Sequence, residues 1–170
     1  MKRLFAVAVA LGLAVVAAAQ TRETSVDALL AGFSGKDACL SASFTLKLAE
    51  IDKVPLQYEG TIFWQDGWFR VTGRDYAIFC NSACVWTVDY VSKEVVQDEA
   101  SGLSDIVPDG TVRASYSPDG KRLEAISITT EKGTVEITVP SMEFIPLKEE
   151  SFFTLDVSAL PEDFVVTRMD

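Results

Sequence analysis

The chain has 170 residues, with 25 acidic and 15 basic side chains, a formal net charge of −10 and no histidine. A chain of this length can bury one substantial core but not two. The negative charge argues against nucleic acid as a partner, which would need clustered lysines and arginines. Without histidine the chain lacks the most common general base and metal ligand, so we expect a binding protein rather than an enzyme, with no metal and no cofactor.

The N-terminal segment has the three parts of a cleavable secretory signal peptide. Two basic residues at 2–3 precede an uncharged apolar run that ends at Ala17, and small residues continue to Ala19. The run is shorter than the roughly 20 residues that a membrane-spanning helix needs. We expect residues 1–19 to be removed, which changes the formal charge from −10 to −12, and residues 20–170 to form one soluble exported domain. The residue directly after the cleavage site is Gln20 and not a cysteine, so we expect no lipid anchor there.

The segment 24–35 is predicted to be an amphipathic helix. Thr24 or Ser25 can cap its start, and Gly35 can end it. Its apolar residues recur at the spacing of one helix face: Val26, Leu29, Leu30 and Phe33. Such a stripe needs an apolar surface to cover.

Most of the following chain alternates between apolar and polar residues, which indicates antiparallel strands. Asp66-Gly67 is typical of a two-residue hairpin turn, and this turn would set Trp64 opposite Phe69. The large apolar side chains of this part would then share one face of a sheet: Phe44, Leu46, Leu48, Tyr58, Ile62, Trp64, Phe69 and Val71.

A second hairpin is predicted between residues 76 and 90, with 81–83 as its loop. In that register three pairs face each other across the strands: Cys80 and Cys84, Ile78 and Trp86, Tyr76 and Val88. Ile78, Trp86 and Val88 would therefore extend the apolar face.

The three cysteines leave more than one pairing open, because an odd number cannot all pair within one chain. Cys80 and Cys84 could form a disulfide across the hairpin, and an exported protein would meet an oxidising compartment. Two free or inert thiols are the main alternative, and a pairing with Cys39 is a third.

The remaining elements are predicted from shorter patterns. Ile128 faces Val135 if their hairpin has a two-residue turn or a bulge. A last strand is predicted at 152–157, an edge or crossing segment at 141–150, and a single helical turn at 103–107. Consecutive short strands with tight turns predict a mainly β domain of the α+β class, a curved antiparallel sheet with one apolar face and one helix.

Several segments, which together extend over about residues 24–167, match one family in order and spacing. Besides the first helix they are 43–46 (SFTL), 59–64 (EGTIFW), 68–71 (WFRV), 85–89 (VWTVD), 94–96 (EVV), 151–157 (SFFTLDV) and 164–166 (FVV). In these segments the chain resembles the LolA family of periplasmic lipoprotein carriers.

The resemblance implies an incomplete antiparallel β-barrel (a half-barrel) covered by the N-terminal helix, with an apolar interior that holds the acyl chains of lipoproteins. It implies a monomer in the periplasm whose partners are acylated lipoproteins or lipid, an inner-membrane ABC transporter and an outer-membrane acceptor. The implied cavity residues are Phe44, Leu46, Leu48, Tyr58, Ile62, Trp64, Phe69, Val71, Ile78, Trp86 and Val88. The implied lid residues are Leu29, Leu30 and Phe33.

The chain departs from the family at one position. The family's carriers have an arginine in the hairpin region that helps to hold the lid closed. In this chain the turn is Gln65-Asp66-Gly67 and contains no arginine. Arg70 is nearby, but the alternation of the strand places its side chain on the outer face. Two other interpretations of the sequence remain open: a module that senses lipid or lipoprotein on the same fold, and a structural domain in which the aromatic side chains fill the interior.

Overall fold

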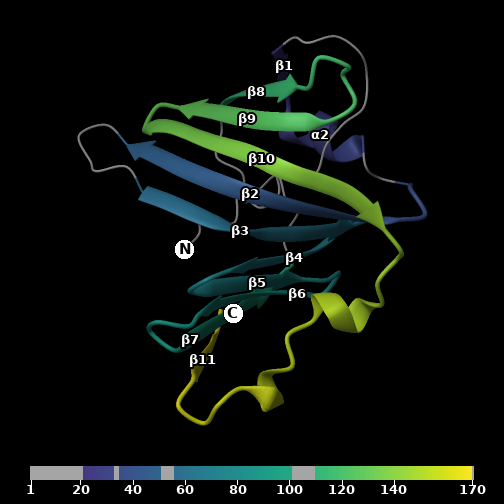
Figure 1. Cartoon of the computed structure of the whole chain (residues 1–170). Coiled ribbons are helices and arrows are strands. Elements are labelled where there is room, and N and C mark those ends of the chain that lie inside the picture. Colours follow the sequence, from purple (N-terminus) through teal and green to yellow (C-terminus); the bar gives the residue numbers. More distant parts are fainter. Residues whose placement is uncertain (1–20, 33–34, 51–55, 101–109, 170) are drawn as a thin grey trace.

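The computed structural model describes residues 21–32, 35–50, 56–100 and 110–169. They form one eleven-stranded sheet in the order β1-β8-β9-β10-β2-β3-β4-β5-β6-β7-β11. The terminal strands β1 and β11 do not pair with each other, so the sheet is an open, incomplete barrel (Figure 1). The mainly β fold class is confirmed.

The elements run from an N-terminal strand to a C-terminal one. Their bounds are β1 (Arg22–Thr24), α2 (Val26–Ala31), β2 (Cys39–Glu50), β3 (Leu56–Gln65), β4 (Trp68–Gly73), β5 (Tyr76–Cys80), β6 (Cys84–Asp89), β7 (Glu94–Glu99), β8 (Thr111–Tyr116), β9 (Leu123–Thr130), β10 (Gly133–Ile145), the 3₁₀ turns η2 (Glu150–Phe153) and η3 (Val157–Ala159), and β11 (Val165–Arg168). All neighbouring strands are antiparallel except β7 and β11, which are parallel.

Three predictions fall on segments outside the described residues. They are the signal peptide at 1–19, the lid residue Phe33 and the helical turn at 103–107. Within the described part of the chain, no helix is long and apolar enough to cross a bilayer.

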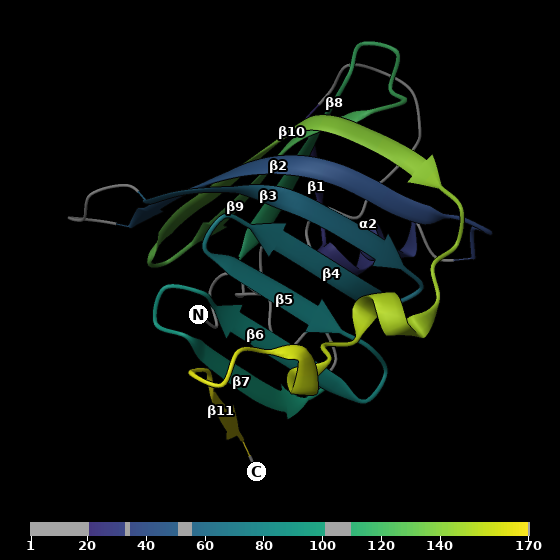
Figure 2. The ribbon, with the colours of Figure 1, turned by 60° about the horizontal axis from the view of Figure 1, so that its bottom comes forward.

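Helix α2 is shorter than the predicted segment 24–35. The Ser25 hydroxyl accepts the Ala28 N–H at 3.1 Å, which is the expected N-terminal cap. Leu29 is 2% exposed and belongs to the core. In Figures 1 and 2 the sheet bends so that α2 lies on its inner side, while η2 and η3 lie in front of its outer side.

The β3–β4 hairpin has the predicted register. Trp64 pairs with Phe69 and Ile62 pairs with Val71. Asp66 and Gly67 have φ values of 47° and 93°, and a two-residue turn with two positive φ values matches the twist of the strands. In the β9–β10 hairpin Val135 likewise pairs with Ile128, as predicted.

The segment 141–150 was predicted to be an edge or a crossing, and its first half, 141–145, is an edge at the C-terminal end of β10. The strand pairs with both β9 and β2 up to Thr138, and after a bulge its last five residues, 141–145, pair with β2 alone.

The predicted last strand at 152–157 is wrong. Glu150–Phe153 forms η2 and Val157–Ala159 forms η3. The Thr154 hydroxyl donates to the Glu150 carbonyl at 2.9 Å, and the Asp156 carboxylate accepts the Ser158 N–H at 3.0 Å. These local side-chain hydrogen bonds favour turns over a strand ladder.

Candidate functional site

The two faces of the sheet carry separate apolar clusters. The inner cluster contains Leu29, Leu40, Ala42, Phe44, Leu46, Ile62, Trp64, Phe69, Val71, Ile78, Cys80, Val85, Val112, Ala114, Leu123, Ile126, Ile128, Ile137 and Val139. The outer cluster contains Ala77, Phe79, Trp86, Val88 and Val95, with Cys84, Leu155, Val157, Leu160 and Phe164 packed against them. The inner cluster is the candidate site, because strands from β2 to β10 contribute buried side chains to one continuous apolar core.

Most of the predicted cavity residues meet on this inner face. Those within the inner cluster are Phe44, Leu46, Ile62, Trp64, Phe69, Val71 and Ile78, and those packed against it are Leu48 and Tyr58. Of the predicted lid residues, Leu29 lies in the cluster. The side chain of Leu30 and all of Phe33 fall outside the described part of the chain.

Trp86 and Val88 were predicted to line the cavity, and this prediction is wrong, because the predicted register of the second hairpin is wrong by one residue. Phe79 pairs with Trp86 and Ala77 pairs with Val88. A slip of one residue moves every side chain of a strand to the other face. Trp86 and Val88 therefore belong to the outer cluster and do not line the inner face.

The cause of this register is the side chain of Asn81. Its amide oxygen accepts the N–H groups of Ala83 and Cys84, each at 2.9 Å, and its main-chain N–H donates to the Cys84 carbonyl at 3.1 Å. Asn81 and Cys84 thus close a two-residue turn at 82–83 instead of the predicted three-residue loop. An asparagine side chain commonly fixes a turn in this way.

Of the alternatives left open for the cysteines, the disulfide between Cys80 and Cys84 is absent for the same reason, and the free thiols are present. Cys80 pairs with Val85 and Cys84 pairs with Glu99. Cys80 lies in the inner cluster and Cys84 packs against the outer one, so the two thiols are on opposite faces, and both are free. Burial, followed by the nearby Cys84, raises the pKa of Cys80 to about 12, which leaves its thiol protonated and unreactive.

A large part of the inner face was not included among the predicted cavity residues. It comes from the other half of the barrel: Val112 and Ala114 on β8, Leu123, Ile126 and Ile128 on β9, and Ile137 and Val139 on β10. The strict alternation in 111–116, with Val112 and Ala114 buried between exposed neighbours, is the signal that could have found β8.

Half-buried apolar side chains gather at one end of the inner face, which we call the rim. It consists of Leu48, Tyr58, Tyr76 and Val135, all packed against the inner cluster. Val135 pairs with Leu48 and Leu48 pairs with Leu56, and Leu56 is 54% exposed. The rim therefore joins the buried inner surface to solvent through apolar groups.

Two tyrosines and two glycines shape the rim. The rings of Tyr58 and Tyr76 meet edge to face, with their centroids 6.1 Å apart, and the Tyr76 hydroxyl donates to the Glu59 carbonyl at 3.4 Å. Gly60 pairs with Gly73. A Cβ atom at Gly60 would lie 3.1 Å from the Phe44 ring, and one at Gly73 would overlap the ring of Tyr76. The aromatic rings thus cover the glycines.

The polar atoms near the inner face are few. Trp64 is 3% exposed, and its Nε1–H has no hydrogen-bond acceptor among the described residues. Leaving a buried donor unpaired costs about 1–3 kcal/mol. Arg70 lies on the outer side, where its guanidinium carbon is 4.9 Å from the Phe79 ring centroid and 4.8 Å from that of Phe152. It holds the C-terminal segment to the sheet and does not reach the inner face.

Comparisons with known proteins concern the fold. No protein-family model and no curated protein sequence matches this chain. Among solved structures it is similar to an uncharacterized conserved protein of Thermus thermophilus, with 13% identity and a TM-score of 0.48, over 78% of this chain and 91% of that one. It is also similar to a LolA superfamily protein of Nitrosomonas europaea, with 9% identity and a TM-score of 0.43, over 71% of this chain and 91% of that one.

The described side chains of the inner cluster offer little chemistry. The cluster contains only apolar side chains and the protonated thiol of Cys80. Among the described residues, no group of three or more cysteines, aspartates or glutamates is placed to hold a metal ion. The arrangement suits an apolar ligand held by burial alone.

Proposed function

We propose that this protein is a periplasmic carrier that shelters the acyl chains of lipoproteins against its inner cluster. The observation that carries the proposal is the continuous apolar inner face of an open sheet, which reaches solvent at the rim. We expect an acyl chain to enter at the rim side chains Leu48, Tyr58, Tyr76 and Val135, and the inner cluster beyond them contains no charged side chain among its members.

The energetics of acyl chains support a carrier. Each buried methylene stabilises by about 0.8 kcal/mol, so a long acyl chain in water is disfavoured by roughly 10 kcal/mol. A lipoprotein with such chains cannot cross an aqueous compartment at a useful rate unless they are covered. An apolar face covers them without a covalent step.

The signal peptide predicted at 1–19 supports export of the carrier, and the resemblance to the LolA family implies that it is a monomer. By its resemblance to the LolA family, it would receive lipoproteins from an inner-membrane ABC transporter and deliver them to an outer-membrane acceptor. Helix α2 would act as a lid: Leu29 already packs in the inner cluster, and Leu30 and Phe33 continue the same stripe in sequence.

The proposal can be tested with membranes that contain an acylated lipoprotein. The purified protein is added, the membranes are sedimented, and the lipoprotein in the soluble fraction is measured. We expect a soluble one-to-one complex. Leu48→Asp should reduce release strongly, because it places a charge at the apolar rim. Lys47→Asp is the matched control, since Lys47 is the exposed neighbour on the opposite face, and it should release lipoprotein like the wild type.

A lipoprotein that lacks acyl chains serves as a second control and should not form the complex. Absence of a soluble complex with the wild-type protein would contradict the carrier. Binding to the membrane without release would favour instead the lipid-sensing module that the sequence leaves open.

A further inference from the structure

The phenol hydroxyls of Tyr58 and Tyr76 bring polar groups to the otherwise apolar rim. The Tyr76 hydroxyl already donates to the Glu59 carbonyl at 3.4 Å. The Tyr58 hydroxyl has no hydrogen-bond partner in the described part of the chain. Tyr58 is only half-buried, and its hydroxyl is not one of the fully buried unpaired atoms, unlike the Nε1–H of Trp64. A ligand at the rim can therefore reach the Tyr58 hydroxyl.

The charge beside these two tyrosines is negative. Asp89 pairs with Tyr76 across β5 and β6. The Asp89 carboxylate accepts the N–H groups of Ser92 at 3.0 Å and of Val91 at 2.8 Å. These hydrogen bonds keep the pKa of Asp89 below its usual value, so its carboxylate is ionised at neutral pH.

Basic side chains do not balance this charge at the hydroxyls. Among the described residues at this end of the sheet, the basic ones are exposed and lie on the outer face or in turns: Lys47, Arg74, Lys93 and Lys132. Lys93 pairs with Asp163 on the C-terminal segment. Burial, followed by Tyr58, raises the pKa of Tyr76 to about 12, and no described cation offsets this rise. None of these cations therefore acts on the Tyr76 hydroxyl.

This combination favours an uncharged acceptor over a carboxylate. An ester carbonyl needs only one donor, which the Tyr58 hydroxyl can supply. A carboxylate at the same place would lose part of its hydration without gaining a cation, and this loss is costly. It would also be repelled by the charge of Asp89.

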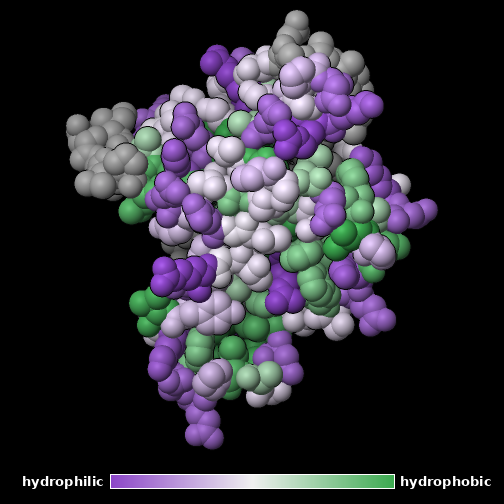
Figure 3. Space-filling view, in the orientation of Figure 1, coloured by the Kyte–Doolittle hydropathy of each residue, from purple (hydrophilic) through white to green (hydrophobic). Residues whose placement is uncertain are grey.

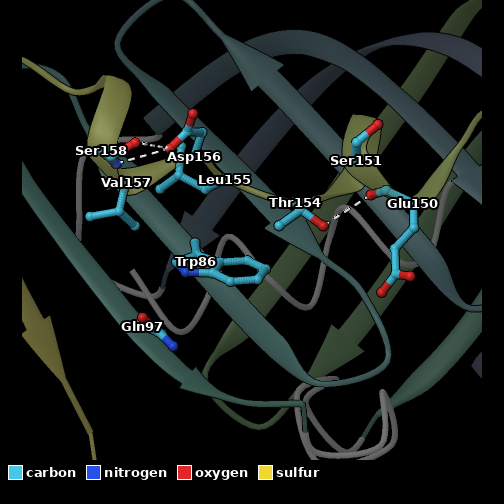
Figure 4. A pocket seen from close by; sticks show the side chains of 9 residues that line it. All are labelled: Trp86, Gln97, Glu150, Ser151, Thr154, Leu155, Asp156, Val157 and Ser158. Carbon is cyan, nitrogen blue, oxygen red and sulfur yellow. Dashed lines mark hydrogen bonds between the residues drawn. The ribbon is translucent and has the colours of Figure 1, made fainter.

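A second concave surface lies on the outer side of the sheet, and it suits an ester less well. This outer groove has a volume of about 610 Å³ and lies between β6, β7 and the C-terminal segment, towards which hydrophobic residues gather in Figure 3. The Ser158 hydroxyl in it already donates to the Asp156 carboxylate at 2.6 Å (Figure 4). The Thr154 hydroxyl likewise donates to the Glu150 carbonyl at 2.9 Å. These two hydroxyls are thus used within the segment itself, whereas that of Tyr58 is open.

We propose that Tyr58 determines ligand specificity: its hydroxyl donates to the ester carbonyl of an acyl chain at the rim, so the inner site prefers ester-linked acyl chains to free fatty acids. Tyr76 is a positioning residue, because its ring holds the Tyr58 ring edge to face. The alkyl part of the ligand lies against the inner cluster. This inference rests on the proposed function, since it names the form in which the acyl chain binds.

The test compares three ligands with the same alkyl chain: methyl decanoate, decanoate, and decyl methyl ether, which has no carbonyl. Each displaces a brominated fatty acid from the full chain with Trp68→Phe/Trp86→Phe, and recovery of Trp64 fluorescence measures the displacement. The titrations are made at about pH 8, where decanoate is ionised. Tyr58→Phe removes the hydroxyl and keeps the ring. Tyr116→Phe is the matched control, because Tyr116 also packs against the inner cluster but lies on β8 and not at the rim.

We expect methyl decanoate to bind about tenfold more tightly than decanoate, because the site offers the carboxylate no cation. It should bind about fivefold more tightly than the ether, as for one neutral hydrogen bond. Tyr58→Phe should abolish the difference between ester and ether, and Tyr116→Phe should keep it. Thermal unfolding of both variants checks that the fold is retained.

The outcomes separate this inference from the proposed function. Decanoate that binds as tightly as its ester would overturn the preference for esters. An ester no tighter than the ether, or an advantage that persists in Tyr58→Phe, would overturn the role of Tyr58. In each of these cases acyl chains still bind and the carrier stands. If no chain binds, the proposed function fails and this inference fails with it.

Discussion

Trp64 and Phe69 face each other across the β3–β4 hairpin with their rings nearly parallel, at an interplanar angle of 11° and a centroid distance of 6.2 Å. Phe69 is completely buried. Phe69→Ala should therefore lower the free energy of unfolding by about 3–5 kcal/mol, through lost burial and the cavity it leaves. Val91→Ala is the control, because Val91 is 75% exposed and its change should stay within about 0.5 kcal/mol. Denaturant unfolding measures both, and a small effect at Phe69 would mean that this part of the inner face is loosely packed.

The rim makes a second prediction, about Gly73 and Tyr76. A Cβ at Gly73 would overlap the Tyr76 ring, so Gly73→Ala should destabilise the protein by about 1–3 kcal/mol through overpacking. Tyr76→Ala removes the ring and with it the clash, so Gly73→Ala should cost much less in that background. A double-mutant cycle by denaturant unfolding measures this coupling. Costs that simply add would contradict the proposed contact.

The ionisation of Tyr76 gives a third prediction. Burial, followed by the nearby Tyr58, raises the pKa of Tyr76 to about 12, above the usual value of about 10 for tyrosine. Between these pH values the unfolded chain loses this proton and the folded chain keeps it, so stability falls as the pH rises. Absorbance titration should show a late phenolate step that is absent in Tyr76→Phe. The variant should also lose less stability between about pH 10 and about pH 12.

How far the sequence predicts the fold is clearest in the two hairpins. The β3–β4 register could be predicted because Asp66 and Gly67 both adopt positive φ, which few other residue pairs tolerate. The turn at 81–84 carries no such dipeptide and allows a loop of two or three residues. Which of the two loop lengths forms depends on the Asn81 side chain and on its partner Thr154, which lies 73 residues away in the chain.

The alternation of apolar and polar residues could not reveal the correct register of β5 and β6 either. The C-terminal segment covers the outer face of β5 and β6, so Phe79 and Trp86 on that face are buried, as Ile78 is on the other. A strand that is buried on both faces loses the period of two. The same covering explains why Trp86 and Val88 were placed in the cavity, and why the outer groove has no signature in the sequence.

The turn itself makes a fourth prediction. Asn81 is buried and its amide oxygen accepts two main-chain N–H groups, so Asn81→Ala should cost about 1–3 kcal/mol of stability by leaving donors unpaired. Asn81→Asp keeps the acceptor and loses only the amide donor to Thr154, so its cost should be smaller. Thermal and denaturant unfolding of the two variants give the comparison. Equal losses would show that the acceptor does not fix the turn.

The central claim is that acyl chains bind against the inner cluster, and quenching of tryptophan fluorescence by a brominated fatty acid tests it most directly. Two of the three tryptophans report on different faces, since Trp64 lies in the inner cluster and Trp86 in the outer one. Trp68→Phe/Trp86→Phe leaves Trp64 as the reporter of the inner face, and Trp64→Phe/Trp68→Phe leaves Trp86 as the reporter of the outer one. The account predicts saturable quenching of Trp64 and none of Trp86. Quenching of Trp86 alone, or of neither tryptophan, would contradict it.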